Sequence, residues 1–247
     1  VAALRNGLND ELVDKRLAPV METVRRVAAG LPLDTALIGF AGAPWTVACY
    51  MVEGAGSRDF ATVRRMAMTN PDVFRQLIDI LVDATTRYLN AQIEAGAEVI
   101  QLFDTWAGVL PTGEFQRWAV EPVARIIEKV GEKHPAVPII AFPRGAGVNY
   151  LNYAAQTGAE CVGIDATVPP EWAASHIQKL ATVQGNLDPM ALVTGGAVME
   201  RAATRILAAL GRGPFVFNLG HGITPETPPE HVARLAELIR AWHHRPA

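Results

Sequence analysis

Short runs of apolar and β-branched residues recur along the chain, and each is followed by a loop rich in Gly, Pro or Asp and then by a longer segment. The runs are almost continuously hydrophobic rather than alternating, which is typical of strands buried on both faces of a parallel sheet. The predicted strands are ALIGFAG (36–42), EVIQLFD (98–104), VPIIAFP (137–143), ECVGID (160–165), ATVQGN (181–186) and PFVFNLG (214–220).

The segments between these strands have the three-to-four-residue apolar spacing of amphipathic helices. Segment 71–96 is predicted to be a helix that stops at Gly96, and segment 227–242 a helix with Thr227 as its N-cap. A further helix is expected over roughly residues 8–30. The patterns of segments 71–96 and 227–242 are explained by packing alone.

Alternating strands and helices indicate an α/β protein with a parallel sheet. Every predicted strand ends in conspicuous residues, in the stretches GFAGAPW, FDTWAG, FPRGAG, GIDATVP, QGNLDP and NLGHGI. One face therefore collects the unusual chemistry, as in a (β/α)₈ TIM-type barrel. An open doubly wound sheet is the second choice, because no GxGxxG follows the first strand.

The count of strands differs from that of a closed barrel, because six are visible where eight are needed. The opening helix leaves no room for the other two, so we expect them to precede Val1. The prediction is one barrel domain over residues 1–247, incomplete at its N-terminus.

Composition narrows the class of protein further. Half of the 247 residues are hydrophobic, yet no run approaches the roughly 18 apolar residues of a membrane span, and the N-terminus lacks a signal-peptide core. The net charge of −3 and the scattered arginines disfavour nucleic-acid binding. Cys49 and Cys161 lie far apart, which disfavours a disulfide framework or a zinc site. We expect a soluble cytoplasmic protein that binds neither membrane nor nucleic acid.

Two residues at strand ends are candidates for proton transfer. His221 lies between glycines in NLGHGI and either occupies a tight turn or shuttles a proton near neutral pH. Tyr50 follows GFAGAPW and is either a core aromatic of a short helix or a phenol directed into the barrel mouth. Spacing alone leaves both choices open.

The remaining candidates are polar groups directly after strands. Thr105 in FDTWAG offers a hydroxyl, whereas Asp104 either acts as a base or braces neighbouring loop amides. Arg144 in FPRGAG is the one arginine at a predicted strand end and hence the best cation for an anionic substrate, although a surface ion pair explains it equally well. Asp188 in QGNLDP is expected to be a helix N-cap.

Taken together, GFAGAPWT with YMVEG, QLFDTWAG, QGNLDP and NLGHGI, in this order, resemble the uroporphyrinogen decarboxylase family of haem biosynthesis. The resemblance extends over essentially the whole chain. It implies a (β/α)₈ barrel, usually a homodimer, that converts uroporphyrinogen to coproporphyrinogen by removing CO₂ from four acetate side chains without metal or organic cofactor.

The resemblance also assigns roles to individual residues. The tyrosine of YMVEG matches Tyr50, a phenol that contacts substrate, and the aromatic of LFD matches Phe103, which lines the pocket. A serine in the family's next loop matches Thr105, which keeps the hydroxyl and adds a methyl group. The histidine of NLGHG matches His221, expected to bind a carboxylate or assist proton transfer, and we expect Arg144 to contribute to substrate binding.

One departure from the family pattern is large. The family has an arginine-rich loop of the form RQAGRY after its first strand and an aspartate in SDI after its second, and neither motif occurs in this chain. In the family, those groups bind the substrate carboxylates and the pyrrole NH groups. This departure agrees with the count of six strands.

Two alternatives remain open at this point. Zinc-dependent corrinoid methyltransferases share the barrel but need an HxC pair, and the corresponding stretch here, IIAFPRGAG, contains neither His nor Cys. An inactive truncated barrel is the other alternative, since an open barrel leaves two unpaired strand edges.

Overall fold

The computed structural model describes residue 4 and residues 10–242. These residues form two compact units. Unit 1 contains the described residues up to Pro143 together with Gln156–Ala159, and unit 2 contains Arg144–Ala155 and the described residues from Glu160 onward.

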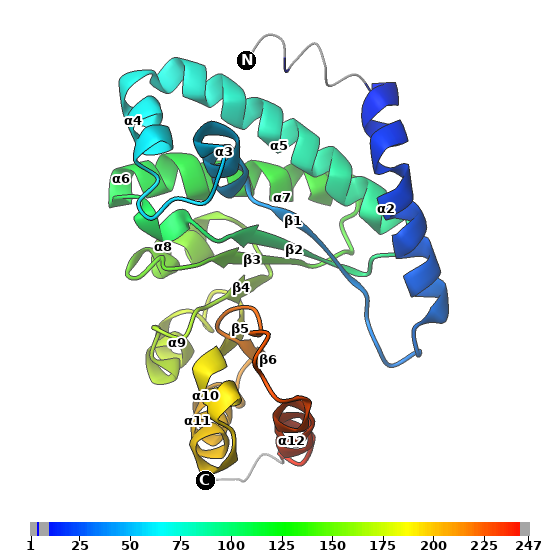
Figure 1. Ribbon diagram of the computed structural model, residues 1–247, viewed down its shortest axis with the longest axis vertical. Helices are drawn as coiled ribbons and strands as arrows, with labels where there is room; N and C mark the ends of the chain where they lie inside the picture. Colours follow the sequence, from blue (N-terminus) through cyan, green and yellow to red (C-terminus); the bar gives the residue numbers. More distant parts are fainter. Residues whose placement is uncertain (1–3, 5–9, 243–247) are drawn as a thin grey trace. The chain divides into compact units, whose positions relative to one another are not determined.

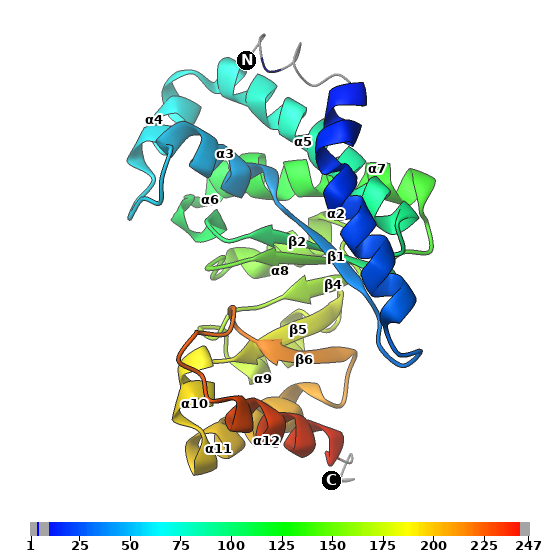
Figure 2. The ribbon, with the colours of Figure 1, turned by 45° about the vertical axis from the view of Figure 1, so that its right-hand side comes forward.

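Unit 1 is built on three parallel strands with helices packed against them. Strand β1 (Ile38–Gly42) pairs with β2 (Val99–Asp104), and β2 pairs with β3 (Ile139–Pro143). In Figures 1 and 2, the long helices α5 and α7 lie on the same face of these strands. The helical elements of the unit are α2 (Asp10–Gly30), α3 (Pro44–Glu53), α4 (Ala61–Thr69), α5 (Pro71–Glu94), η1 (Ala107–Val109), α6 (Thr112–Phe115), η2 (Gln116–Val120) and α7 (Glu121–Lys133).

Helix α5 is fixed to strand β1 by close packing and by one buried amide. Gln92 accepts a hydrogen bond from the Phe40 N–H (3.0 Å) and donates one to the Phe40 carbonyl (2.9 Å). A Cβ at Gly39 would lie 2.9 Å from the Gln92 Oε1 atom, so only glycine permits this approach. The amide thus satisfies backbone groups at the edge of the sheet.

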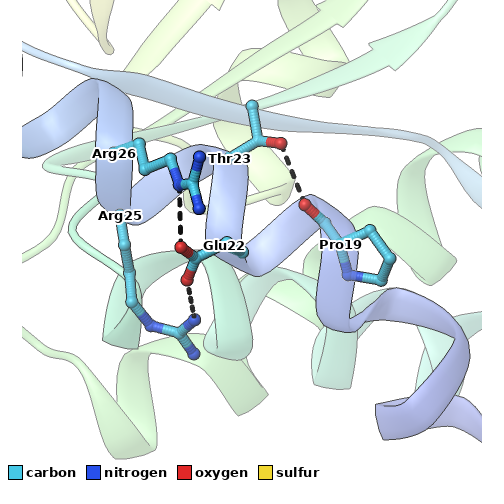
Figure 3. Close-up of polar contacts among 5 residues, drawn as sticks. All are labelled: Pro19, Glu22, Thr23, Arg25 and Arg26. Atoms are coloured by element: carbon cyan, nitrogen blue, oxygen red, sulfur yellow. Dashed lines mark hydrogen bonds and ion pairs between the residues drawn. The ribbon is translucent and has the colours of Figure 1, made fainter.

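Helix α2 carries a proline in its interior, at Pro19. Pro19 has no N–H to donate to the preceding turn, which weakens the helix at this point. Figure 3 shows the polar contacts of the following turn, in which the Thr23 hydroxyl donates to the Pro19 carbonyl (2.9 Å) and Glu22 pairs with Arg25 (3.3 Å) and Arg26 (2.8 Å). These exposed pairs contribute little each, but they span the turn after the proline.

Unit 2 repeats the strand and helix alternation. Strand β5 (Thr182–Leu187) pairs in parallel with both β4 (Cys161–Gly163) and β6 (Phe215–Leu219). Helix α11 packs against β5 and against the neighbouring helices of the unit. The helices that follow unit 1 in the chain are α8 (Asn149–Gln156), α9 (Pro170–His176), α10 (Pro189–Thr194), α11 (Gly196–Leu210) and α12 (Pro229–Arg240).

All six strands predicted from the sequence are confirmed, but their burial on both faces is wrong for β1 and β6. Ile38 and Phe40 of β1 are 44% and 60% exposed, and Val216 of β6 is 44% exposed. Among the described residues within each unit, β1 pairs with β2 alone and β6 with β5 alone. A strand with one neighbour is less covered than the fully buried β3.

The two helices predicted in detail are present, with one correction. Helix α5 ends at Glu94, and Gly96 follows with φ of +115°. Helix α12 begins at Pro229 with Pro228 as its N-cap and no side-chain cap, so the prediction of Thr227 as N-cap is wrong. The hydroxyl of Thr227 is instead hydrogen-bonded to that of Thr224 (3.1 Å).

Asp188 caps α10 as predicted, because its carboxylate accepts from the Met190 N–H at 2.9 Å.

Within the described part of the chain, no helix combines the length and apolar character needed to cross a bilayer.

Candidate active site

Strand β2 sends consecutive side chains to opposite faces, which separates Phe103 from Asp104. The Phe103 ring meets Phe40 of β1 and Phe142 of β3 edge to face, with centroids 5.9 and 6.3 Å apart. Asp104 points instead to the helix side, where it contacts Thr46 of α3. Phe103 therefore belongs to an aromatic row across the strands, and Asp104 belongs to the layer between strand and helix.

A set of hydrogen bonds joins the end of β2 to the start of α3. The Thr46 hydroxyl donates to Asp104 Oδ1 (2.6 Å) and accepts from the Trp106 N–H (3.1 Å). The Trp45 indole N–H donates to the Trp106 carbonyl (3.0 Å). We call Thr46, Asp104 and Trp106 the β2–α3 bracket.

Burial controls the protonation of the bracket carboxyl. Asp104 is only 1% exposed, and its Oδ2 atom is buried without a hydrogen-bond partner among the described residues. Desolvation raises the pKa of Asp104 from 3.8 to about 7, against the opposing effect of the Thr46 hydrogen bond. Burial, followed by the negative charge of Asp104, also raises the pKa of the Cys49 thiol. Asp104 therefore connects the end of β2 to helix α3 through the Thr46 hydroxyl.

Three of the predicted site residues, Tyr50, Phe103 and Thr105, belong to unit 1 and lie at or after the carboxyl ends of β1 and β2. Tyr50 on α3 is 48% exposed, and its ring meets that of Trp106 edge to face at 6.3 Å. The Phe60 ring also packs against the Trp106 indole, with the two ring centroids 4.6 Å apart. Thr105 lies between the two bracket residues Asp104 and Trp106 and is half-buried. Tyr50 is accordingly not a core aromatic.

The other two predicted residues, Arg144 and His221, belong to unit 2. Arg144 is half-buried and begins the segment that follows β3. His221 is exposed and follows β6, and its Nδ1 atom accepts from the Gly222 N–H at 2.7 Å. A neutral imidazole with Nδ1 as acceptor carries its proton on Nε2, which makes Nε2 a donor.

The loop that begins with Arg144 is held by a buried aspartate. Asp165 accepts hydrogen bonds from the Gly145 N–H (2.7 Å), the Tyr150 hydroxyl (2.8 Å), the Thr167 N–H (2.9 Å) and the Thr167 hydroxyl. Burial alone would raise the pKa of Asp165, but these four bonds outweigh it and hold the pKa below its usual value.

The loop that carries His221 is fixed by close backbone packing. A Cβ at Gly220 would lie 2.4 Å from the backbone nitrogen of Ala166, so this position accepts only glycine. The Asn186 amide donates to the carbonyls of Asp165 (3.0 Å) and Val168 (2.7 Å). The motifs QGNLDP and GIDATVP therefore support each other within unit 2.

Sequence reasoning missed Thr46, Tyr150 and Asp165. Asp165 stands at the end of a predicted strand, a signal that could have identified it. Thr46 lies within helix α3 and Tyr150 within helix α8, and their partners are 58 and 15 positions away, so no local pattern marks them.

Two further features concern other ligands. No three His, Cys, Asp or Glu side chains of the described residues come close enough together to hold a metal ion. A groove of about 470 Å³ in unit 1 is lined by Phe40, Gly42, Val47 and Tyr88 among others, but it does not include the predicted site residues Tyr50, Phe103 and Thr105.

Comparison with known proteins supplies the family. The family model described as "Uroporphyrinogen decarboxylase (URO-D)" matches residues 3–242. Uroporphyrinogen decarboxylases of Rhodospirillum rubrum and Paracoccus denitrificans are 58% and 54% identical over 92% and 97% of this chain. The chain spans 65% and 69% of the lengths of these two relatives.

Solved structures support the fold. A methyltransferase from Methanosarcina mazei matches with a TM-score of 0.76 at 23% identity, over 90% of this chain and 64% of that protein. A B12-independent methionine synthase from Shewanella matches with a TM-score of 0.63 at 12% identity, over 89% of this chain and 66% of that protein. Both are TIM-barrel proteins, which confirms the predicted fold class and says nothing about the reaction.

The resemblance seen in the loop motifs is confirmed by the match over residues 3–242 and by the identity of 58% to a curated relative: the chain belongs to the uroporphyrinogen decarboxylase family.

Proposed function

We propose that this chain serves the decarboxylation of the acetate side chains of uroporphyrinogen to give coproporphyrinogen. The observation that carries this proposal is the 58% identity to a uroporphyrinogen decarboxylase over 92% of the chain. The placement of polar groups after consecutive strands supports it, because active sites of parallel barrels lie at that end.

The chemistry asks the protein for proton donors and for charge stabilisation. Protonation of a pyrrole ring carbon makes the ring an electron sink, and the bond between the acetate CH₂ and its carboxylate then breaks with release of CO₂. The electron pair moves into the ring, the exocyclic carbon takes up a proton to become a methyl group, and the ring proton is lost. Donors placed where charge develops accelerate such steps.

The described residues fit these roles within each unit. In unit 1, the Tyr50 phenol on α3 and the Thr105 hydroxyl after β2 are donors, and the Phe103 ring at the end of β2 offers an apolar surface to a pyrrole. In unit 2, the His221 Nε2 is a donor for a carboxylate or for proton transfer. The Arg144 guanidinium is the cation for a propionate or acetate group.

The proposal is tested by turnover. The chain is incubated anaerobically with uroporphyrinogen, alone and as a chimera in which the R. rubrum relative supplies the part that this chain does not match. Products are oxidised and separated by carboxyl number. We expect Tyr50→Phe and His221→Ala to lower turnover about a hundredfold, as loss of a general acid does. No product with fewer than eight carboxyl groups from the chain or a folded chimera would overturn the function.

Two matched substitutions control for the chemistry of the change. Tyr88→Phe on α5 removes the same hydroxyl, and His176→Ala on α9 removes the same imidazole, in helices outside the candidate site. Both are expected to keep turnover. Equal turnover in the site variants and these controls would overturn the assignment of Tyr50 and His221 while leaving the reaction itself standing.

The family resemblance also supports a soluble cytoplasmic homodimer without a bound cofactor. Light scattering during gel filtration tests the assembly, and a mass equal to one chain at micromolar concentration would refute the dimer.

A further inference from the structure

The β2–α3 bracket connects the two segments of unit 1 that carry Tyr50 and Thr105. Thr46 lies in the first turn of α3, and Tyr50 follows four residues later, one helical turn along the same face. Thr105 lies between Asp104 and Trp106, which are both bound by the Thr46 hydroxyl. The Thr46 hydroxyl therefore fixes helix α3, which carries Tyr50, against the loop that carries Thr105.

Additional contacts make the connection rigid. The Ala43 N–H donates to the Phe103 carbonyl at 2.8 Å, and the Trp45 indole binds the Trp106 carbonyl at 3.0 Å. The Trp106 ring contacts the Tyr50 ring directly. A shift of the loop after β2 would therefore move Tyr50 and Thr105 with respect to each other.

We propose that Thr46 and Asp104 are positioning residues that hold the Tyr50 phenol and the Thr105 hydroxyl in the arrangement required by the tetrapyrrole. The inference rests on the proposed function. Neither residue reaches the substrate itself, because Asp104 faces the helix layer and Thr46 is 5% exposed.

The cost of the bracket supports a role beyond stability. A buried carboxyl with an unpartnered oxygen is unfavourable compared with an apolar side chain of similar size. The Thr46 hydroxyl donates to this carboxyl and at the same time accepts from the Trp106 N–H. The arrangement exchanges stability for a defined position of the loop, which is what a site with several placed donors needs.

The test compares Thr46→Val, which removes the hydroxyl at constant shape, with Thr46→Ser, which keeps it. Thr86→Val is the matched control, because Thr86 is a buried threonine of α5 whose hydroxyl has no hydrogen-bond partner within the described part of the chain. Two measurements are made on the 247-residue chain under conditions where all variants are folded: amide hydrogen exchange at Trp106, and affinity for uroporphyrin, an oxidised analogue with the same eight carboxyl groups.

We expect Thr46→Val to exchange the Trp106 amide at least about tenfold faster and to bind uroporphyrin about tenfold more weakly, the effect of leaving a buried donor and a buried acceptor without their partner. Thr46→Ser and Thr86→Val should match the unsubstituted chain in both measurements. A Thr46→Ser variant as weak as Thr46→Val would show that packing of the methyl group matters, and would overturn the role of the hydrogen bonds.

The outcomes separate this inference from the proposed function. Absence of uroporphyrin binding by both the unsubstituted chain and the folded chimera would refute the proposed function, and this inference with it. Normal binding by Thr46→Val, with the unsubstituted chain also binding, would refute the positioning role alone. Unchanged exchange at Trp106 in Thr46→Val would refute the bracket whatever the binding result.

Discussion

The buried carboxyl of the bracket predicts a distinctive dependence of stability on pH. The substitution that tests this pH dependence is Asp104→Asn, because the asparagine side chain keeps the shape and the acceptor for the Thr46 hydroxyl but cannot ionise. The folded-state pKa of Asp104 is about 7, against 3.8 for the ordinary carboxyl. The difference of about three pKa units corresponds to roughly 4 kcal/mol in the free energy of unfolding.

The sign follows from the direction of the shift. Because the pKa is raised by folding, the folded state holds the proton more tightly than the unfolded chain does. The stabilisation is complete below about pH 4, is lost progressively as the pH rises to about 7, and changes little beyond that. The free energy of unfolding of the unsubstituted chain, minus that of Asp104→Asn, should therefore fall by roughly 4 kcal/mol between pH 4 and pH 8.

Urea unfolding at a series of pH values measures this difference. Tryptophan fluorescence is a suitable signal for unit 1, because Trp45, Trp106 and Trp118 lie there. Other carboxyl groups titrate in both proteins and cancel in the difference. Since the Thr46 hydrogen bond lowers the pKa of Asp104, the Thr46→Val background should move the fall to higher pH. A difference that stays constant from pH 4 to pH 8 would refute the buried, desolvated carboxyl.

Three further substitutions probe the packing of the two units. Thr86→Val should leave the unfolding temperature unchanged or raise it, since it removes a buried hydroxyl that has no partner among the residues described by the structure, and a clear decrease would contradict this. Asp165→Asn should lower the free energy of unfolding in urea by roughly 3 kcal/mol at pH 7, because the amide NH₂ group replaces a carboxylate oxygen that accepts two hydrogen bonds. Because the pKa of Asp165 is lowered in the folded state, this loss should become smaller at acid pH. A loss that does not depend on pH would argue against the ionised form. Gly220→Ala should lower stability by about 2 kcal/mol or more through its clash with Ala166, and an unchanged melting temperature would refute the close approach.

The fold was predictable from the sequence because the strands are apolar runs and the helices are periodic. The exposure of β1 and β6 was not predictable, because the coverage of a strand depends on its neighbours and not on its own residues. The N-cap of α12 was also wrong, since Thr227 forms a hydrogen bond with Thr224 that competes with capping. The apolar pattern predicted helix α12 correctly, but the hydrogen-bond partner of Thr227 is set by the tertiary structure.

The candidate site was predictable only in part. Tyr50, Thr105 and His221 stand in or near loops after strands, where chemistry is expected in a parallel barrel. The bracket partner Thr46 could not be found, because it lies 58 residues before Asp104 and within a helix. Residues that bind ligand tend to occupy conspicuous loops, whereas residues that hold those loops are placed by the three-dimensional fold.

The two units solve the same problem of loop support with opposite electrostatics. Each has a buried aspartate at or just beyond a strand end, Asp104 at the end of β2 and Asp165 after β4, and each braces a loop that carries a predicted site residue. At Asp104, desolvation outweighs the hydrogen bonds from the hydroxyl and the backbone of Thr46, and its pKa is raised. Asp165 has four donors, which more than replace the lost water, and its pKa is lowered. The loop of Arg144 is therefore held by an anion over the whole neutral range, whereas the loop of Thr105 is held by a carboxyl that exchanges its proton near pH 7, so any effect of neutral pH on loop order should appear in unit 1 first.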